Sequence, residues 1–236
     1  MSDPKLSIGT RKESSLHRSL KFQYSGEGGS IEYAAASYVC DAITEDGELI
    51  EVQTGSFGPL KEKIKHLAKN NKVKIIYPII KQKRIELFNP KGDLIHSRKS
   101  PIKGGNYDLF NALVYAPLLP KTKNLTIELA FVDIVEKRIA DGSGSWRRKG
   151  VKIADRMLEY WHNSLILKNS RDYLQFVPFT VNEYFTVTKM AEKSGIKREM
   201  AQKAIYVLVK MQLLEKTGKE GRALVYKIKK AKKKQG

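Results

Sequence analysis

The stretch from residue 49 to residue 79 constrains the fold more than any other part of this sequence. Residues 49–54 and 73–79 are short runs rich in β-branched and other apolar residues, which is typical of strands. Between them, Pro59 suits the first position of a helix, and apolar residues follow it at helical spacing. A strand, a helix and a strand in this order form a crossover whose two strands lie parallel in one sheet. The chain is therefore predicted to be an α/β protein.

Further elements are predicted on either side of this crossover. Helical or alternating apolar patterns mark each of them, and glycine- or proline-containing breaks separate them. The predictions are a helix over residues 13–24, strands over 31–34 and 38–43, a hairpin over 84–96, a short helix over 108–115 and a strand over 125–135.

The second part of the chain is predicted to be a separate domain. Residues 141–150 are rich in glycine, serine and arginine and are predicted to be a linker. Helices are predicted over 151–167, 186–193 and 197–211, followed by strands over 213–217 and 223–228 and a basic tail. Two helices around a glycine turn and then a basic β-ribbon are the order of a winged helix-turn-helix. The predicted domains are thus residues 1–140 and, after the linker, residues 151–236.

The charge of the chain narrows the classes of binding partner that we expect. The sequence has 44 Lys and Arg residues and 25 Asp and Glu residues, a formal net charge of +19. Such an excess favours nucleic acid, here expected to be double-stranded DNA, although an anionic membrane surface or simple solubility would also explain it. Apolar runs are too short to span a membrane, and the polar N-terminus differs from a secretory signal. Cys40 is the only cysteine, so an internal disulfide is excluded and a reducing, cytoplasmic location is expected.

The most informative side chains lie on the strands before the crossover. If residues 45–47 form a three-residue turn, counting back along the strands places Asp41 directly across from Glu51. Opposed residues lie about 4.5–5.5 Å apart at Cβ, and two carboxylates so close repel each other unless a cation lies between them. Oxygen ligands of this kind suit Mg²⁺ or Mn²⁺. Gln53 shares the face of Glu51 and would line the same site.

These residues together predict a phosphodiesterase. A Mg²⁺ ion next to a phosphodiester polarises the phosphoryl group and activates water, and Gln53 would position that water. The alternative interpretation is a solvent-exposed hairpin face that carries ordinary acidic and amide side chains.

Basic side chains on other segments are candidates for contacts with DNA. Those on the presumed recognition helix would reach phosphates and base edges in a major groove, and those at the wing tip would touch adjacent phosphates or the minor groove. Those in two basic loops would grip a duplex beside the acidic pair. Solvated loops and a protein-binding winged helix are the alternatives. The candidates are Lys197, Arg198, Gln202 and Lys203 on the helix, Lys219 and Arg222 at the wing tip, and Arg98, Lys99, Lys103, Arg147 and Arg148 in the loops.

Asp41, a turn and then Glu51-Val52, followed by a helix and another strand, resemble the motif of the PD-(D/E)XK nuclease superfamily. The resemblance implies a restriction-endonuclease-like α-β-β-β-α-β core in which Asp41, Glu51 and the Val52 carbonyl bind Mg²⁺. Many members carry a further acidic residue on the first helix. Glu13 matches that place, and Glu32 on the preceding strand competes for the same role.

The sequence departs from that motif at Gln53, where lysine is usual, but some restriction enzymes of the superfamily have glutamine there and still cut DNA. Stretches such as residues 16–21, 98–101 and 146–150 also resemble an uncharacterised prokaryotic family with a nuclease-like first half and a winged-helix second half. We therefore predict a Mg²⁺-dependent DNA endonuclease whose winged helix positions the duplex. The alternatives are a non-catalytic DNA-binding or regulatory protein and an interaction module of a repair or defence complex. RNA stays open as a substrate, and a palindromic cutter would need a homodimer.

Overall fold

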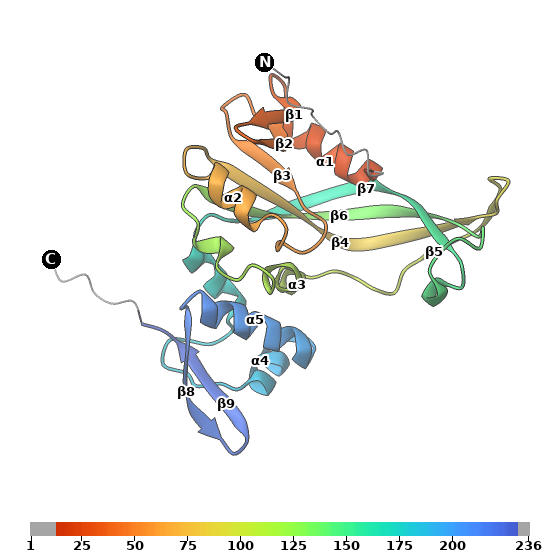
Figure 1. Cartoon of the computed structure of the whole chain (residues 1–236). Helices are drawn as coiled ribbons and strands as arrows, with labels where there is room; N and C mark the ends of the chain where they lie inside the picture. The colour runs from red at the N-terminus through yellow and green to blue at the C-terminus, as the bar shows by residue number, and fades with distance from the viewer. Residues whose placement is uncertain (1–12, 231–236) are drawn as a thin grey trace.

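The computed structural model describes residues 13–230 and contains a seven-stranded sheet and a separate two-stranded one (Figure 1). In the large sheet the strand order is β1-β2-β3-β4-β6-β7, and β5 pairs with β4 outside this path. The fold is therefore mixed α/β with a mostly β core, which confirms the predicted class in its broad form. The strands are β1 (Ser30–Ala35), β2 (Tyr38–Ile43), β3 (Leu49–Val52), β4 (Val73–Phe88), β5 (Leu94–Lys99), β6 (Leu125–Ile139) and β7 (Lys152–Leu167).

The predicted crossover is present. β3 and β4 are parallel and are joined through α2 (Lys61–Leu67), and β4 is also parallel to β6. All four residues of β3 are buried, because this central strand is covered on both faces. Ile50 packs in the cluster on one face and Leu49 in the cluster on the other, as the alternation of strand side chains requires.

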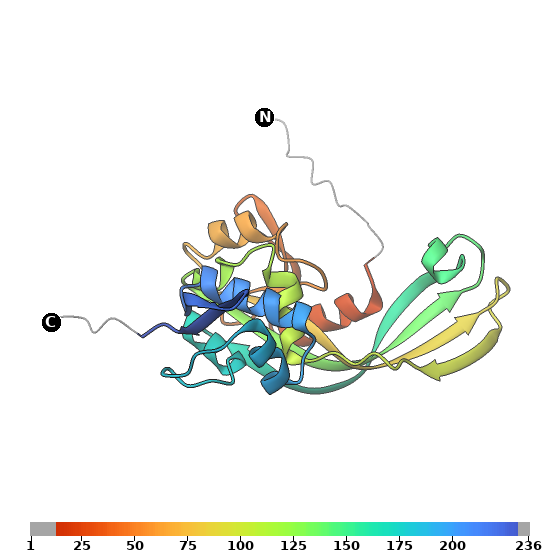
Figure 2. The same cartoon turned by 90° about the horizontal axis from the view of Figure 1, so that it is seen from below.

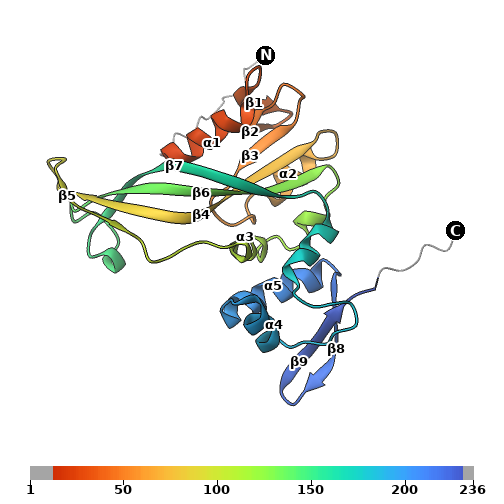
Figure 3. The same ribbon diagram turned by 180° about the vertical axis from the view of Figure 1, so that it is seen from behind.

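Helices cover both faces of the sheet (Figures 1 and 3). α1 (Ser15–Ser25) lies on one face, where Leu16 and Leu20 pack against Ile50, Ile76 and Val132. α2, α3 (Leu109–Leu113) and the C-terminal elements lie on the other face and share one hydrophobic cluster with it. The short 3-10 helices η1 (Asn106–Asp108) and η2 (Leu119–Lys121) flank α3. Among residues 13–230, none of the helices has the length and apolar composition that crossing a membrane needs.

The C-terminal part consists of a 3-10 helix, two α-helices and a β-ribbon, and its helix α5 (Arg198–Lys210) packs against α3. Its elements are η4 (Ser170–Phe176), α4 (Val187–Ser194), α5, β8 (Leu214–Glu220) and β9 (Ala223–Ile228). The Tyr107 hydroxyl donates to the Phe176 carbonyl at 2.8 Å and lies 2.9 Å from Ser194 Oγ, which ties η1 to η4 and α4. Most of the predicted basic tail lies outside the described residues.

The helix predicted over residues 151–167 is wrong, because this segment is β7, an antiparallel partner of β6. Three register shifts interrupt the pairing of the two strands. Each bulge adds a residue to β7 and breaks the two-residue alternation, which leaves apolar side chains at helix-like spacing. The linker predicted over residues 141–150 is likewise wrong. These residues connect two paired strands, so the boundary predicted between residues 140 and 151 falls inside one sheet.

The long strands extend beyond the part of the sheet that α1 covers. β4, β6 and β7 contain 16, 15 and 16 residues, and their outer halves form an arm together with β5. Figure 2 shows this arm bending toward the side on which α1 lies. The β6–β7 connection, residues 140–151, contains η3 (Trp146–Arg148), and we call it the arm tip.

Candidate functional site

β2 and β3 separate at the point where the candidate acidic residues lie. Ala42 pairs with Ile50 and Ile43 with Leu49, which is the predicted register, and Gly47 has the left-handed conformation that the predicted turn requires (φ 78°). Beyond these pairs the ladder ends, and the Val52 amide donates to Asp41 Oδ2 at 2.8 Å instead. The Asp41 side chain thus takes the place of a backbone acceptor where the two strands part.

Three charged side chains at the start of α1 lie next to Asp41. His17 and Lys21 lie four residues apart and therefore share one side of the helix, and Glu13, two residues before the helix begins, contacts both of them. Glu13 Oε1 lies 2.5 Å from His17 Nδ1 and 2.9 Å from Lys21 Nζ. Lys21 Nζ also lies 3.1 Å from Asp41 Oδ1, although the lysine is only 7% exposed. The helix and the residue before its cap thus place two cationic side chains and one acidic side chain near Asp41 of β2.

The position of α1 is fixed at its N-terminus. The Ser14 side chain caps the helix by accepting a hydrogen bond from the His17 amide. Asp155 of β7 accepts hydrogen bonds from both the amide (2.9 Å) and the hydroxyl of Ser15. A carboxylate near the first turn also interacts favourably with the positive end of the helix dipole. A strand far along the chain therefore sets where the helix places its charges.

His17 joins Asp41 to the backbone of β3. Its Nε2 atom lies 3.3 Å from Asp41 Oδ2 and 2.8 Å from the Val52 carbonyl oxygen. Burial alone would lower the pKa of His17, but its hydrogen bond to Asp41 and the charge of that carboxylate outweigh burial and raise the pKa to about 9. The same contacts hold the pKa of Asp41 below its usual value in spite of burial. The imidazole is therefore protonated at neutral pH.

Glu51 has a different cationic partner from Asp41. It is 4% exposed, and its Oε1 atom forms an ion pair with Lys63 Nζ of α2. Burial raises the pKa of Glu51, the Lys63 charge opposes this rise, and the nearby Asp41 charge adds to it. In the described structure each of the two carboxylates thus has a protein cation as its partner, and the two partners come from different helices. We call these side chains the charged cluster: Glu13, His17, Lys21, Asp41, Glu51 and Lys63.

The other two predicted acidic or amide residues contribute less to this arrangement. Glu32 is largely exposed and reaches the cluster only through Lys21 Nζ, 3.8 Å away. Gln53 Nε2 donates to the Ser56 carbonyl at 2.8 Å and so supports the turn after β3. Within residues 13–230, no three His, Cys, Asp or Glu side chains are grouped as a ready-made metal site.

Four of the five predicted basic loop residues lie on the arm and not beside the charged cluster, which corrects their expected place: Arg98, Lys99, Arg147 and Arg148 (Figure 1). Arg98 of β5 and Arg147 and Arg148 of the arm tip line a common hollow of about 270 Å³. Lys99 follows Arg98 on the strand and therefore points to the opposite face. Lys103 lies next to Gly104, whose amide donates to the Ile80 carbonyl in the middle of β4.

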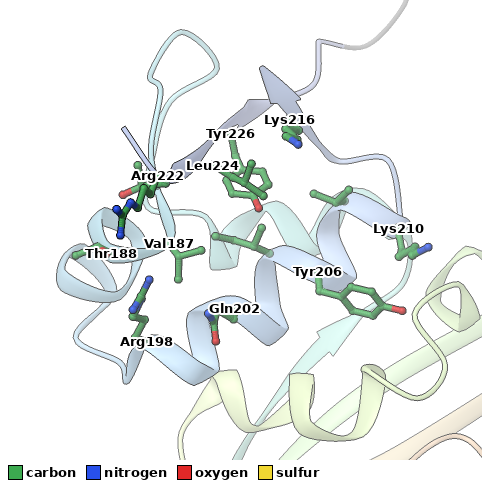
Figure 4. Close-up of a pocket in the computed structure, with 14 residues that line it drawn as sticks. Val187, Thr188, Arg198, Gln202, Tyr206, Lys210, Lys216, Arg222, Leu224 and Tyr226 are labelled. Atoms are coloured by element: carbon green, nitrogen blue, oxygen red, sulfur yellow. The ribbon is translucent and has the colours of Figure 1, made fainter. Parts of the chain in front are cut away.

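The predicted DNA-binding residues of the C-terminal part separate into two groups. Arg198, Gln202 and Arg222 line a hollow of about 540 Å³ between α4, α5 and the β8–β9 ribbon (Figure 4). Lys203 points elsewhere, because its Nζ donates to Asn111 of α3 at 3.0 Å and lies 2.7 Å from Glu199. Lys197 flanks α5 as its N-cap, and Lys219 is exposed on β8. Neither lines the hollow.

Sequence reasoning missed three of the six residues of the charged cluster. None of the three, His17, Lys21 and Lys63, is singled out by the sequence analysis. The spacing of four residues between Glu13, His17 and Lys21 was a usable signal, because it places all three on one side of a predicted helix. The Lys63–Glu51 pair had no comparable signal, since it depends on how α2 packs over the sheet.

Comparison with known proteins assigns the chain to a family. A family model described as a domain of unknown function (DUF8091) matches residues 14–168. The chain belongs to this family. The matched residues begin at the N-cap of α1 and end one residue after β7, so the DUF8091 domain contains the sheet, most of the charged cluster and the arm. η4 and the elements that follow it lie beyond the matched residues.

An uncharacterised protein of Treponema pallidum (strain Nichols) is 28% identical over 187 residues, which cover 79% of this chain and 74% of that protein. No solved structure matches the chain significantly.

Proposed function

We propose that the charged cluster hydrolyses phosphodiester bonds in nucleic acid. The observation that carries the proposal is the separation of β2 and β3, where Asp41, Glu51 and the Val52 carbonyl meet cations from two helices. Titratable groups with shifted pKa values, gathered where a strand pair opens, are typical of catalytic sites. The net charge of +19 favours a polyanionic substrate.

The lysines of the cluster would stabilise charge on the phosphoryl group. Lys21 and Lys63 are both largely buried, so their charges act in a poorly screened environment. They supply the positive charge that Gln53 does not carry. Asp41 and Glu51 hold these ammonium groups in place through ion pairs, and Asp155 positions α1 and with it Lys21.

The oxygen donors fit Mg²⁺ or Mn²⁺ in kind. Asp41 Oδ2 and the Val52 carbonyl oxygen both approach His17 Nε2, so they converge on a position that already holds a positive charge. Asp41, the Val52 carbonyl and Glu51 would hold a divalent ion, which would supply polarisation of the phosphoryl group and activation of water. The protonated imidazole of His17 contacts Asp41 Oδ2 and the Val52 carbonyl oxygen, so it would have to turn away before these oxygens could bind a divalent ion.

The test is cleavage of plasmid, single-stranded DNA and RNA in Mg²⁺, in Mn²⁺ and in EDTA. We expect cleavage only with a divalent ion, and we expect Asp41→Asn to lower the rate by about a hundredfold or more. Asp46→Asn is the matched control, because Asp46 is exposed in the turn of the same hairpin. If the folded wild-type protein binds nucleic acid but cleaves none of these substrates, hydrolysis is not its function.

We also propose that the C-terminal part is a winged helix that binds duplex DNA. α4, α5 and the β8–β9 ribbon follow one another in the order of the helices and the wing, and Arg198 and Arg222 face one hollow from α5 and from the ribbon. Arg198→Ala combined with Arg222→Ala should weaken duplex binding and its salt dependence. Lys203→Ala on the same helix should not, since Lys203 faces α3. Equal effects of the two changes would refute this assignment.

A non-catalytic nucleic-acid-binding protein is the second candidate, and three contacts favour it. Gln53 donates its amide to Ser56, away from the cluster, and each of Asp41 and Glu51 already has a protein cation as partner. This candidate predicts that Asp41→Asn leaves nucleic-acid binding unchanged and that the wild type is inactive with every divalent ion.

A further inference from the structure

The arm carries a hollow whose polar lining is entirely basic. Its volume is about 270 Å³, and its apolar floor is formed by Ile85, Leu87 and Val151. Arginine predominates among the polar residues, and the arginine fork matches the geometry of phosphate oxygens. The polar lining residues are His96, Arg98, Arg138, Arg147, Arg148 and Lys149.

The strand register shows that this hollow opens on the face that α1 covers. Val132 and Ile134 of β6 pack under α1, and Arg138 lies four residues further along the same strand, so it shares their face. Arg138 is opposite Leu87 in the β4–β6 ladder, and Leu87 is opposite His96 in the β4–β5 ladder. The hollow therefore lies on the same side of the sheet as α1, toward which the arm bends in Figure 2.

An exposed tryptophan stands beside the hollow. Trp146 is 85% exposed, the largest exposed fraction among the large hydrophobic side chains of residues 13–230. It precedes Arg147 and Arg148 in η3, which is held by hydrogen bonds within the arm tip from the Arg148 amide to Ser145 and from the Lys149 amide to Trp146. A nucleobase stacks favourably on an indole, whereas an inorganic anion gains nothing from it.

We infer that the arm tip binds a nucleic-acid strand, with its phosphates in the basic hollow and one base stacked on Trp146. The inference rests on the proposed function in that both take nucleic acid as the ligand, but it does not require that the protein hydrolyses it. Basic side chains and an aromatic platform together are the means by which proteins hold unpaired nucleotides. The arm would be a further contact, on strands β4 to β7 and away from the charged cluster on β2, β3, α1 and α2.

The test is the binding of a short labelled single strand to the full chain, measured by fluorescence anisotropy over a range of salt concentrations. Arg147→Ala with Arg148→Ala should reduce the slope of log affinity against log salt by about 1.4, which is about 0.7 for each lost phosphate contact. Lys69→Ala with Lys72→Ala is the matched control, because it removes the same charge from exposed positions after α2. The control should change the slope much less.

A second variant separates stacking from charge. Trp146→Ala should weaken single-strand binding about tenfold and leave the salt slope unchanged. Because Arg148 Nε also donates to the Val151 carbonyl, Arg147→Glu alone is the variant of choice if the double change disturbs the arm tip. It should again reduce the slope, while thermal unfolding stays as in the wild type.

The outcomes distinguish this inference from the proposed function. If the arginine pair and the lysine control have the same effect, or if Trp146→Ala leaves binding unchanged, the arm is not a nucleic-acid contact, even when Asp41→Asn abolishes cleavage. If anionic lipid vesicles bind more tightly than the strand and depend on the same arginines, the arm is a membrane contact and the inference is wrong. If the arm variants weaken binding while the wild type cleaves nothing, the inference stands and hydrolysis fails.

Discussion

Lys63→Met should destabilise the protein by an amount that depends on pH. The side chain of Glu51 is 5% exposed and that of Lys63 is 17% exposed, so their ion pair belongs to the buried class. Removing one partner of such a pair leaves an uncompensated charge, at a cost of about 3–5 kcal/mol. Methionine is similar to lysine in length and flexibility, so the change removes the charge and little packing. We expect the loss of unfolding free energy at pH 7 to be about 3 kcal/mol.

The sign of the pH dependence follows from the carboxylate that remains. Burial already raises the pKa of Glu51 above its ordinary value of 4.5, and removing the Lys63 charge raises the pKa further. An acid with a raised folded-state pKa contributes its stability fully below the unfolded value and loses it as the pH rises through the folded value. The cost of Lys63→Met should therefore be small near pH 4.5 and complete at pH 7.

Urea unfolding followed by circular dichroism at both pH values measures this cost. Lys63→Arg is the control that keeps the charge. The double change Lys63→Met with Glu51→Gln should recover most of the stability, because neither charge of this pair remains. A loss below about 1 kcal/mol at pH 7, the size expected for an exposed pair, would refute the reasoning. An equal loss at both pH values would also refute it.

Three further predictions concern other parts of the fold. Glu136 is 1% exposed, and burial opposes ionisation, but hydrogen bonds from two arginines lower its pKa. The free energy of unfolding should therefore fall as the pH drops below 4.5, and an acid titration followed by circular dichroism should show a smaller fall for Glu136→Gln. Asp155→Ala removes two hydrogen bonds to Ser15 and should cost about 1–2 kcal/mol in urea unfolding, while Asp155→Asn should retain part of that stability. Gly104→Ala places a Cβ 2.7 Å from the Ile80 carbonyl oxygen and should lower the melting temperature, at a cost of about 1–3 kcal/mol. The same change at Gly105 should be tolerated, because no heavy atom outside the neighbouring residues would lie within 4 Å of that Cβ.

Local patterns in the sequence predict the first half of the sheet well. The turn at Gly47 and the strands around it fix the register of β2 and β3 within a few residues of chain, so the pairs Ala42–Ile50 and Ile43–Leu49 follow from counting. The parallel pairing of β3 with β4 follows from the intervening helix in the same way. These features depend only on neighbouring residues, which is why the sequence is sufficient for them.

The errors come from features that depend on distant partners. β7 appeared helical because its bulges are imposed by pairing with β6, and those bulges do not show in the residues of β7 alone. The partners of Asp41 and Glu51 were missed for a related reason, because Lys21 and Lys63 reach them only through the packing of α1 and α2 on opposite faces of the sheet. A net charge of +19 predicts a basic surface, but the surface at the arm depends on which strand ends are neighbours.

The regular alternation of β6 sets a rule for how the arm can change in length. Arg138 faces the hollow because it lies four positions, an even number, after Ile134 under α1. Adding a single residue to β6 between them would turn Arg138 and the rest of the strand end to the opposite face. Relatives with longer or shorter arms should therefore differ by pairs of residues, with matching changes in β4 and β7. Insertions of odd length should be absent from this part of β6 and should occur in the β6–β7 connection or as bulges of the kind that β7 already contains.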